Sequence, residues 1–245
     1  MEKCFGVLCD MVIKACLFDV FGTVVDWRSS VGRDLENFGR EKGIAGIDWL
    51  EFAVEWRKLY QPSMEEVRSG RRAFTILDVL HRESLVKLAE RYRIEGLSEA
   101  EIDHMSRAWH RLDPWPDVLE GLAQLKRRRI IAPCSNGNIA LMVNMAKRAG
   151  LPWDCILGAE TARAYKPMPE AYLASCRQLG LAPAAVMMVA AHNGDLNAAK
   201  AQGLATAFVA RPAEHGPGQT SNLAADPSCV DVAAADFIEL AKRLG

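Results

Sequence analysis

Residues 12–23 read VIKACLFDVFGT, and this stretch decides the fold. Its apolar part, residues 12–20, is rich enough in β-branched residues to predict a buried strand, which ends in a Phe-Gly-Thr turn. Similar short apolar runs recur much later in the chain, at residues 130–134, 186–190 and 206–209. Helical patterns lie between and beside these runs, at residues 118–128, 139–149, 169–179 and 196–202. This alternation of strand and helix predicts an α/β fold with a parallel sheet and right-handed crossovers.

The stretch after the first strand has a different character. It contains charged, amphipathic segments and no strand-like run, with the helical patterns at residues 31–42, 49–66, 73–92 and 99–109. We therefore predict a helical cap domain, residues 26–112, inserted after the first strand of a Rossmann-like core that residues 1–25 and 113–245 form. Residues 211–228 are rich in Pro, Gly and polar side chains, so we expect a surface loop there.

Composition and charge narrow the class of protein. The 245 residues are 50% hydrophobic and 25% charged, as in an ordinary globular protein, and the net charge of -1 gives no field for nucleic acid or an anionic membrane. No uncharged apolar run reaches membrane-spanning length, and the N-terminus lacks the pattern of a signal peptide. The seven cysteines are odd in number and form no Cys-x-x-Cys pair, which is typical of reduced thiols. We expect a cytoplasmic protein with no nucleic-acid or membrane partner.

Ligand sites of parallel sheets lie at the carboxyl ends of the strands. The positions that follow the apolar runs are residues 19–23, 135–138 and 190–195, and Lys166 precedes a helix in a Lys-Pro pair. Each feature has an ordinary structural interpretation. Asp19 could cap a turn, Ser135 could start a helix, and Lys166 could be a solvated surface lysine.

The order of these features is more specific than any one of them. Asp-x-x-Gly-Thr, a helical insert, Ser-Asn after a strand, Lys-Pro and a final acidic residue together resemble the haloacid dehalogenase superfamily over essentially the whole chain. The resemblance implies that Asp19 is the nucleophile and that Lys166 balances its charge. It also implies that Ser135 is the Ser/Thr of the second motif and Asp195 the acidic residue of the last.

Most members of that superfamily are magnesium-dependent phosphatases, and two positions depart from the phosphatase pattern. Phe21 stands where phosphatases typically have a general acid, and Ala191 stands where they typically have a magnesium ligand. Both departures fit the type II haloacid dehalogenases, which use no metal. The local stretches that resemble one branch of that subfamily are FDVFGTVVDWR (18–28), HRLDPWP (110–116), SNGNIA (135–140) and AAHNGD (190–195).

The resemblance assigns further roles by position. It implies that the substrate is bound by Val20, Phe21, Thr23, Ser135 and Tyr172, and the halide by Arg57, Asn136 and His192, with no metal ligand and no cofactor. Other interpretations stay open: Arg57 as a solvated helix residue, Tyr172 as a core residue, and His192 as a structural histidine. Met168 in the Lys-Pro-x-Pro motif and Gly194 in place of a bulky aromatic depart from the common subfamily pattern.

The function implied is hydrolytic dehalogenation of small 2-haloalkanoic acids, haloacetates and L-2-haloacids, to 2-hydroxy acids. It would proceed without metal, through an ester on Asp19. The expected partner is then a small haloacid, and the resemblance implies a homodimer like those of the family. The alternatives are a magnesium-dependent phosphatase of the same superfamily and a non-catalytic binding protein that keeps the fold.

Overall fold

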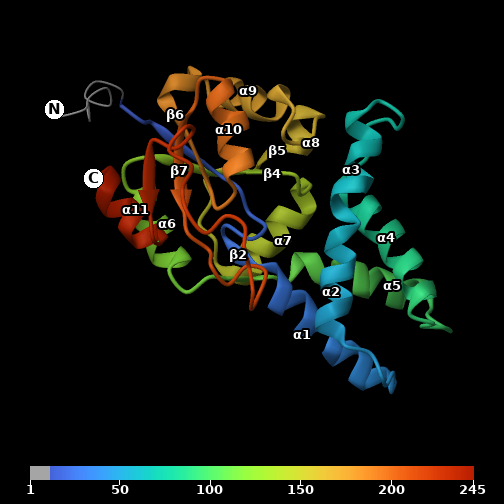
Figure 1. Ribbon diagram of the computed structural model, residues 1–245. Coiled ribbons are helices and arrows are strands. Elements are labelled where there is room, and N and C mark those ends of the chain that lie inside the picture. The colour runs from blue at the N-terminus through green and yellow to red at the C-terminus, as the bar shows by residue number, and fades with distance from the viewer. Residues whose placement is uncertain (1–11) are drawn as a thin grey trace.

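The computed structural model describes residues 12–245, and a sheet of six parallel strands lies at its centre (Figure 1). Across the sheet the strand order is β5-β4-β1-β6-β7-β8. The strands are β1 (Ala15–Phe18), β4 (Ile130–Ser135), β5 (Leu157–Gly158), β6 (Val186–Ala190), β7 (Ala205–Val209) and β8 (Val232–Ala234). The predicted α/β class and parallel sheet are confirmed.

Strand β1 lies inside the sheet, between β4 and β6. Because successive side chains of a strand point to opposite faces, Cys16 and Phe18 join one hydrophobic cluster and Ala15 and Leu17 join the other. The carboxyl ends of parallel strands meet at one edge of the sheet. Asp19, directly after β1, therefore lies beside the ends of β4 and β6.

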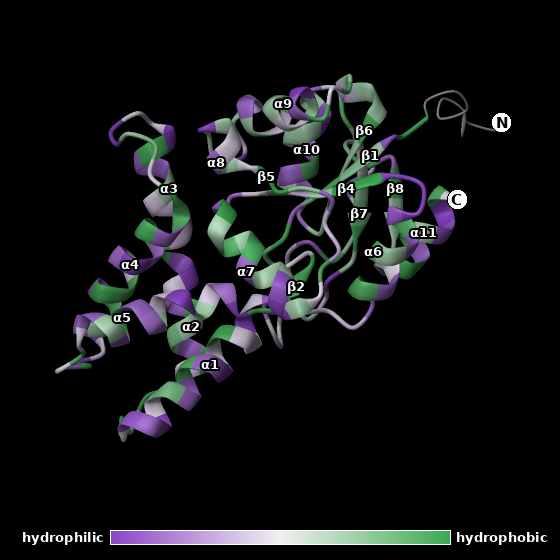
Figure 2. Ribbon diagram, turned by 180° about the vertical axis from the view of Figure 1, so that it is seen from behind, coloured by the Kyte–Doolittle hydropathy of each residue, from purple (hydrophilic) through white to green (hydrophobic). Residues whose placement is uncertain are grey.

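Helices flank the sheet on both faces. Side chains of α6, α7 and α11 contribute to one hydrophobic cluster, and side chains of α9 and α10 contribute to the other. The bounds of the core helices are α6 (Val118–Lys126), α7 (Ile139–Ala149), α8 (Ala159–Ala162), α9 (Pro169–Gln178), η2 (Pro183–Ala185), α10 (Asn193–Ala201) and α11 (Phe237–Leu244). Figure 2 shows hydrophobic colour in the strands, whereas hydrophilic and hydrophobic residues alternate along the helices. This contrast follows from burial of the sheet on both faces.

A group of helices lies to one side of the sheet (Figure 1). Its members are α1 (Trp27–Lys42), α2 (Trp49–Lys58), α3 (Tyr60–Arg68), α4 (Leu77–Arg91), α5 (Glu99–Ser106) and the short η1 (Arg107–His110). In α1, Val31, Leu35 and Phe38 recur at helical spacing and are buried. Asp26 begins this helix by accepting a hydrogen bond from the N–H of Ser29, and Gly43 ends it in the left-handed conformation. These elements form the cap that the amphipathic segments predicted.

Two short strands connect this helical group to the sheet. β2 (Val25–Asp26) pairs antiparallel with β3 (Asp113–Pro114), so both connections run side by side. The proposed domain boundaries, between residues 25 and 26 and between residues 112 and 113, stay a prediction. The paired strands β2 and β3 lie at these two boundaries.

The expectation of a surface loop over residues 211–228 is wrong for two charged residues. Arg211 and Glu214 are buried. The guanidinium of Arg211 donates to both carboxylate oxygens of Asp117 at 2.9 Å and to the carbonyl oxygen of Thr23 at 2.8 Å. This buried ion pair fixes the start of the loop beside the turn that carries Asp19, because an unpaired buried charge would be costly.

Within residues 12–245, no helix combines the length and the apolar character needed to cross a bilayer. The five cysteines of this described part are free thiols, and four of them are buried. Cys4, Cys9 and most of the stretch searched for a signal peptide lie outside the described residues.

Candidate active site

The turn after β1 fixes Asp19 at the edge of the sheet. Gly22 has φ +88°, a left-handed conformation that favours glycine. The Thr23 hydroxyl, one turn further on, donates to Asp19 Oδ2 at 2.8 Å and accepts the N–H of Ala191 at 2.9 Å. Thr23 therefore holds the Asp19 carboxylate and links the ends of β1 and β6.

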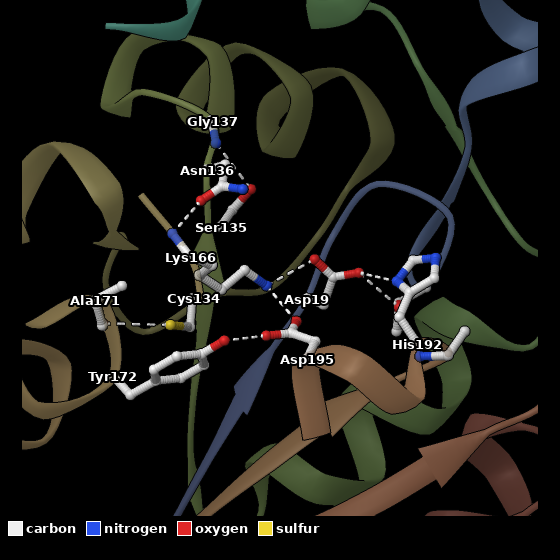
Figure 3. A network of polar contacts seen from close by, with 12 residues as sticks. Asp19, Cys134, Ser135, Asn136, Gly137, Lys166, Ala171, Tyr172, His192 and Asp195 are labelled. Carbon is white, nitrogen blue, oxygen red and sulfur yellow. Dashed lines mark hydrogen bonds and ion pairs between the residues drawn. The ribbon is translucent and has the colours of Figure 1, made fainter. Parts of the chain in front are cut away.

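Lys166 lies between two carboxylates (Figure 3). Its Nζ donates to Asp19 Oδ1 at 2.8 Å and to Asp195 Oδ2, and its side chain is buried. The loop between α8 and α9 carries this lysine, and Asn136 Oδ1 accepts its backbone N–H at 2.8 Å. Burial alone would lower the pKa of Lys166, but the charges of Asp19 and Asp195 raise it well above its usual value. Lys166 is therefore a permanent cation at this site.

The same charges set the state of Asp19. Burial opposes its ionisation, but Lys166 and His192 outweigh burial and hold the pKa of Asp19 well below its usual value. The carboxylate is therefore ionised at neutral pH, as a nucleophile must be.

Asp195 has a different environment at the first turn of α10. The hydroxyl of Tyr172, from α9, donates to Asp195 Oδ1 at 2.5 Å. Burial and the nearby charge of Asp19 raise the pKa of Asp195, against the opposing effect of Lys166. Two carboxylates with pKa values displaced in opposite directions are suited to separate roles, one as nucleophile and one as base.

The end of β4 supplies polar groups on the other side of Lys166 (Figure 3). The Ser135 hydroxyl accepts the N–H of Gly137 at 3.0 Å, and its side chain is fully buried. Asn136 borders the cavity, and its amide oxygen is already used by the backbone of Lys166. The side-chain NH₂ of Asn136 is thus the group that this residue can offer to a ligand.

The cap supplies Arg57, which stacks on an aromatic ring. Its guanidinium carbon lies 4.0 Å from the centre of the Tyr60 ring and 5.8 Å from that of Phe21. Its buried NH1 has no hydrogen-bond partner among residues 12–245. A half-buried guanidinium with a buried donor that has no partner among these residues is suited to bind an anion.

His192 connects Asp19 to a carboxylate that the sequence did not indicate. Its Nδ1 lies 3.0 Å from Asp19 Oδ2, and its Nε2 lies 3.0 and 2.9 Å from the two oxygens of Glu214. Burial disfavours the charged ring, but hydrogen bonds to Asp19 and Glu214 raise the pKa of His192 to about 10.

These groups surround one cavity of about 560 Å³ between the sheet edge and the cap. The predicted site residues that border it are Asp19, Phe21, Arg57, Asn136, Lys166, Tyr172, His192 and Asp195. Three predicted residues, Val20, Thr23 and Ser135, are fully buried beside it and do not form its wall. The sequence did not indicate five residues at the site: Tyr60, Gln61, Arg68 and Asn222 in the wall, and Glu214 behind His192.

The arrangement of the acidic, histidine and cysteine side chains bears on whether the protein could hold a metal ion. Among residues 12–245, no group of three or more His, Cys, Asp or Glu side chains is arranged to hold a metal ion. The ammonium of Lys166 lies between Asp19 and Asp195, the two carboxylates of the cavity.

Comparison with known families identifies the class of protein. The family model of haloacid dehalogenase-like hydrolases matches residues 13–203, and the chain belongs to this family. The family inferred from the sequence motifs is thereby confirmed.

Individual relatives give a finer comparison. The crystal structure of the defluorinating L-2-haloacid dehalogenase Rha0230 is 48% identical, with a TM-score of 0.92 over 95% of each chain. The L-2-haloacid dehalogenase PA0810 is 47% identical, with a TM-score of 0.89 over 95% of this chain and 100% of that one. The (S)-2-haloacid dehalogenase 4A of Burkholderia cepacia is 28% identical over 202 residues, which are 81% of this chain and 84% of that protein. The chain is therefore similar to dehalogenases over nearly its whole length.

Proposed function

We propose that this protein hydrolyses the carbon–halogen bond of small 2-haloalkanoic acids, without a metal ion, and releases 2-hydroxy acids. One observation carries the proposal: Asp19 is a buried, ionised carboxylate at the cavity, held by Lys166 and without a proton donor at Phe21. Halide leaves as an anion and needs no proton. The similarity to L-2-haloacid dehalogenases supports the same substrate class.

The first step is an in-line displacement by Asp19. One carboxylate oxygen forms a bond to C2 of the substrate, the C2–halogen bond breaks, and the electron pair leaves with the halide. The product is an ester between Asp19 and the substrate carbon, with inverted configuration at C2. Lys166 keeps the nucleophile ionised until the attack.

The second step is hydrolysis of that ester. Water attacks the carboxyl carbon of Asp19, and Asp195 is the proposed base, since its raised pKa favours proton uptake. Tyr172 and Lys166 fix the orientation of Asp195. Oxygen from water enters Asp19, and the original Asp19 oxygen leaves in the hydroxy acid.

Two sets of donors are available for the substrate. The backbone N–H groups of Val20 and Phe21 make no hydrogen bond within the described part of the chain, and we assign them with Ser135 to the substrate carboxylate. We assign the halide to the free NH1 of Arg57 and the side-chain NH₂ of Asn136. The halide role predicted for His192 stays a prediction, and both of its ring nitrogens have partners in this structure.

The side chains near Asp19 support the proposed metal independence. Ala191 is buried after β6, and its contribution to the site is a backbone N–H donated to Thr23. It offers no oxygen ligand where phosphatases of this superfamily typically have a carboxylate. The expected cytoplasmic location and homodimer remain predictions, and light scattering of the purified protein tests the dimer.

The direct test is halide release from fluoro-, chloro- and bromoacetate by the purified protein, beside a generic phosphate ester with magnesium. We expect halide and glycolate in equal amounts and no phosphate release. Phosphate release without halide release would overturn the proposal in favour of a phosphatase. Inactivity on both substrate classes would favour a binding protein that keeps the fold.

A further inference from the structure

Glu214 is a buried carboxylate at the active site to which the two-step reaction gives no role. Its side chain is 1% exposed, and it comes from the loop that follows β7. His192 Nε2 lies within 3.0 Å of both Glu214 oxygens, and Trp27 Nε1 donates to one of them at 3.3 Å. Burying a carboxylate is costly unless charged or polar partners compensate it. His192 is the cation that compensates this one most closely.

The turn that carries the nucleophile leaves space for this carboxylate. A Cβ atom placed on Gly22 would lie 2.1 Å from Glu214 Oε1, closer than any real contact allows. The left-handed φ of +88° also favours glycine at this position. Gly22 is therefore required both by the turn and by the approach of Glu214 to His192.

The two contacts of His192 define its charge. Asp19 lies at Nδ1 and Glu214 at Nε2, and ionised carboxylates only accept hydrogen bonds. A neutral imidazole has a single N–H and could donate to only one of them. Burial opposes the ionisation of Glu214, but the hydrogen bond and charge of His192 lower the pKa of Glu214 below its usual value, so both carboxylates are ionised. The ring between them is therefore an imidazolium, and a pKa of His192 raised to about 10 agrees with a charged ring at neutral pH.

The donors around Asp19 make its two oxygens different. Oδ2 accepts from the Thr23 hydroxyl at 2.8 Å and lies 3.0 Å from His192 Nδ1. Among the described residues, Oδ1 accepts from Lys166 alone, at 2.8 Å. The oxygen with fewer donors keeps a free lone pair, so Oδ1 is the better attacking atom, and Oδ2 becomes the carbonyl oxygen of the ester.

We infer that the imidazolium of His192, held in place by Glu214, stabilises the oxyanion that forms on Asp19 Oδ2 during ester hydrolysis. In this role His192 is a catalytic residue and Glu214 is a positioning residue. The inference rests on the proposed dehalogenation, and it names groups of the second step beyond Asp195. It gives His192 a different role from binding the departing halide.

The electron flow of this step is complete with groups on the chain and one water. Water oxygen bonds to the Asp19 carboxyl carbon, Asp195 takes the water proton, and the carbonyl π pair moves onto Oδ2. His192 Nδ1–H and the Thr23 hydroxyl donate to that oxyanion. The pair then returns to re-form the carbonyl, the bond from the carboxyl carbon to Oδ1 breaks, and the leaving alkoxide takes the proton back from Asp195.

The two reaction steps respond differently to this donor. In the first step Asp19 loses negative charge as the ester forms, so a donor on Oδ2 stabilises the reactant more than the transition state. In the second step Oδ2 gains charge, so the same donor stabilises the transition state. Weakening the His192–Glu214 pair should therefore slow ester hydrolysis and leave halide release as fast or faster.

The experiment is a single-turnover measurement on Glu214→Gln with enzyme in excess over chloroacetate. Chloride and glycolate are followed separately, and intact-protein mass spectrometry detects the ester on Asp19. We expect parental or faster chloride release, glycolate formation slowed about 10- to 100-fold, and accumulation of the ester. His215→Gln is the matched control, because His215 lies 3.6 Å from the same carboxylate but makes no contact with Asp19, and it should behave as the parent.

Equal slowing of chloride and glycolate in Glu214→Gln would overturn the inference, because His192 would then act on the departing halide. If Glu214→Gln does not fold, His192→Asn gives a second variant, which replaces the imidazolium with a neutral donor and should accumulate the same ester. Nitrogen NMR of the parent protein tests the charge of His192 independently of activity. Both ring nitrogens of His192 should carry protons at pH 8. A neutral ring at that pH would overturn the inference, whereas absence of any chloride release by the parent would refute the proposed function instead.

Discussion

Replacement of Lys166 by methionine removes the cation between Asp19 and Asp195 and keeps a side chain of similar length. Opposite unit charges 2.8 Å apart attract by about 6 kcal/mol at an effective dielectric constant of about 20. The desolvation of a buried ammonium offsets part of this attraction, and removal of one partner from a buried pair typically costs about 3–5 kcal/mol. We expect the free energy of unfolding of Lys166→Met to fall by about that amount.

Activity should fall for the same electrostatic reason. Without Lys166, burial raises the pKa of Asp19 and His192 is left as the cation that lowers it, so a larger fraction of the nucleophile is protonated at a given pH. A loss of about 3 kcal/mol in the stabilisation of ionised Asp19 corresponds to about a hundredfold loss of turnover. Because the protonated form is inactive, the remaining activity of the variant should rise as the pH rises, whereas the lowered pKa of Asp19 in the parent removes this dependence.

The assay is chloride release from chloroacetate between about pH 5 and pH 9, with urea unfolding of each protein. Lys58→Met is the matched control, since Lys58 is an exposed lysine of α2 that pairs with Glu55 and does not line the cavity. The control should keep parental turnover and pH dependence. A Lys166→Met protein with parental turnover at pH 6 would refute the assignment of Lys166 as the group that keeps Asp19 ionised.

Three further predictions concern Asp19, Tyr172 and metal ions. Asp19→Asn should slow halide release by at least about a thousandfold, because an amide is a poor nucleophile. Circular dichroism should show a parental fold, since Lys166 keeps Asp195 as a partner. Parental turnover would contradict the assignment of Asp19 as nucleophile. Tyr172→Phe removes the hydroxyl that fixes the orientation of Asp195, so glycolate formation should slow about tenfold, whereas single-turnover chloride release should keep its parental rate. Slowing of both would mean that Tyr172 acts in the first step, the displacement of halide. EDTA should leave turnover unchanged, as measured by chloride release before and after dialysis, and a strict magnesium requirement would exclude the metal-free mechanism.

The sequence could predict the order of the elements and the meeting of Asp19, Lys166 and Asp195. Short apolar runs and helical periodicity locate β1, β4, β6 and β7, and parallel strands bring the residues after them to one edge. The amphipathic spacing in residues 26–112 likewise predicted the cap helices. These inferences succeed because each depends on local pattern or on a general rule of parallel sheets.

The sequence could not predict features that depend on tertiary contact. Glu214 becomes part of the site because Arg211 fixes the loop to Asp117 and because Gly22 leaves room for a carboxylate. None of these contacts has a periodic signal, and a loop rich in Pro and Gly is usually exposed. Strand β5 has two residues, too few for periodicity, and it forms because β4 offers a partner.

The contacts of His192 also depend on tertiary structure and could not be predicted from the sequence. Its position after β6 indicated the active-site edge, but only the structure shows one nitrogen facing Asp19 and the other facing Glu214. The direction of an imidazole ring depends on partners that lie far away in the sequence. Glu214 is one of two acidic residues in the loop over residues 211–228, with Asp226, and no local pattern distinguishes it.

The central claim is that Asp19 itself attacks the substrate carbon. The most direct measurement is a single turnover of chloroacetate in water enriched in heavy oxygen, with enzyme in excess, followed by mass spectrometry of the glycolate and of the peptide that contains Asp19. The mechanism predicts glycolate with an unlabelled hydroxyl and one heavy oxygen in Asp19, because water attacks the carboxyl carbon of the ester. Heavy oxygen in the glycolate hydroxyl, with Asp19 unlabelled, would show that water attacks C2 directly and would contradict the assignment of Asp19 as nucleophile.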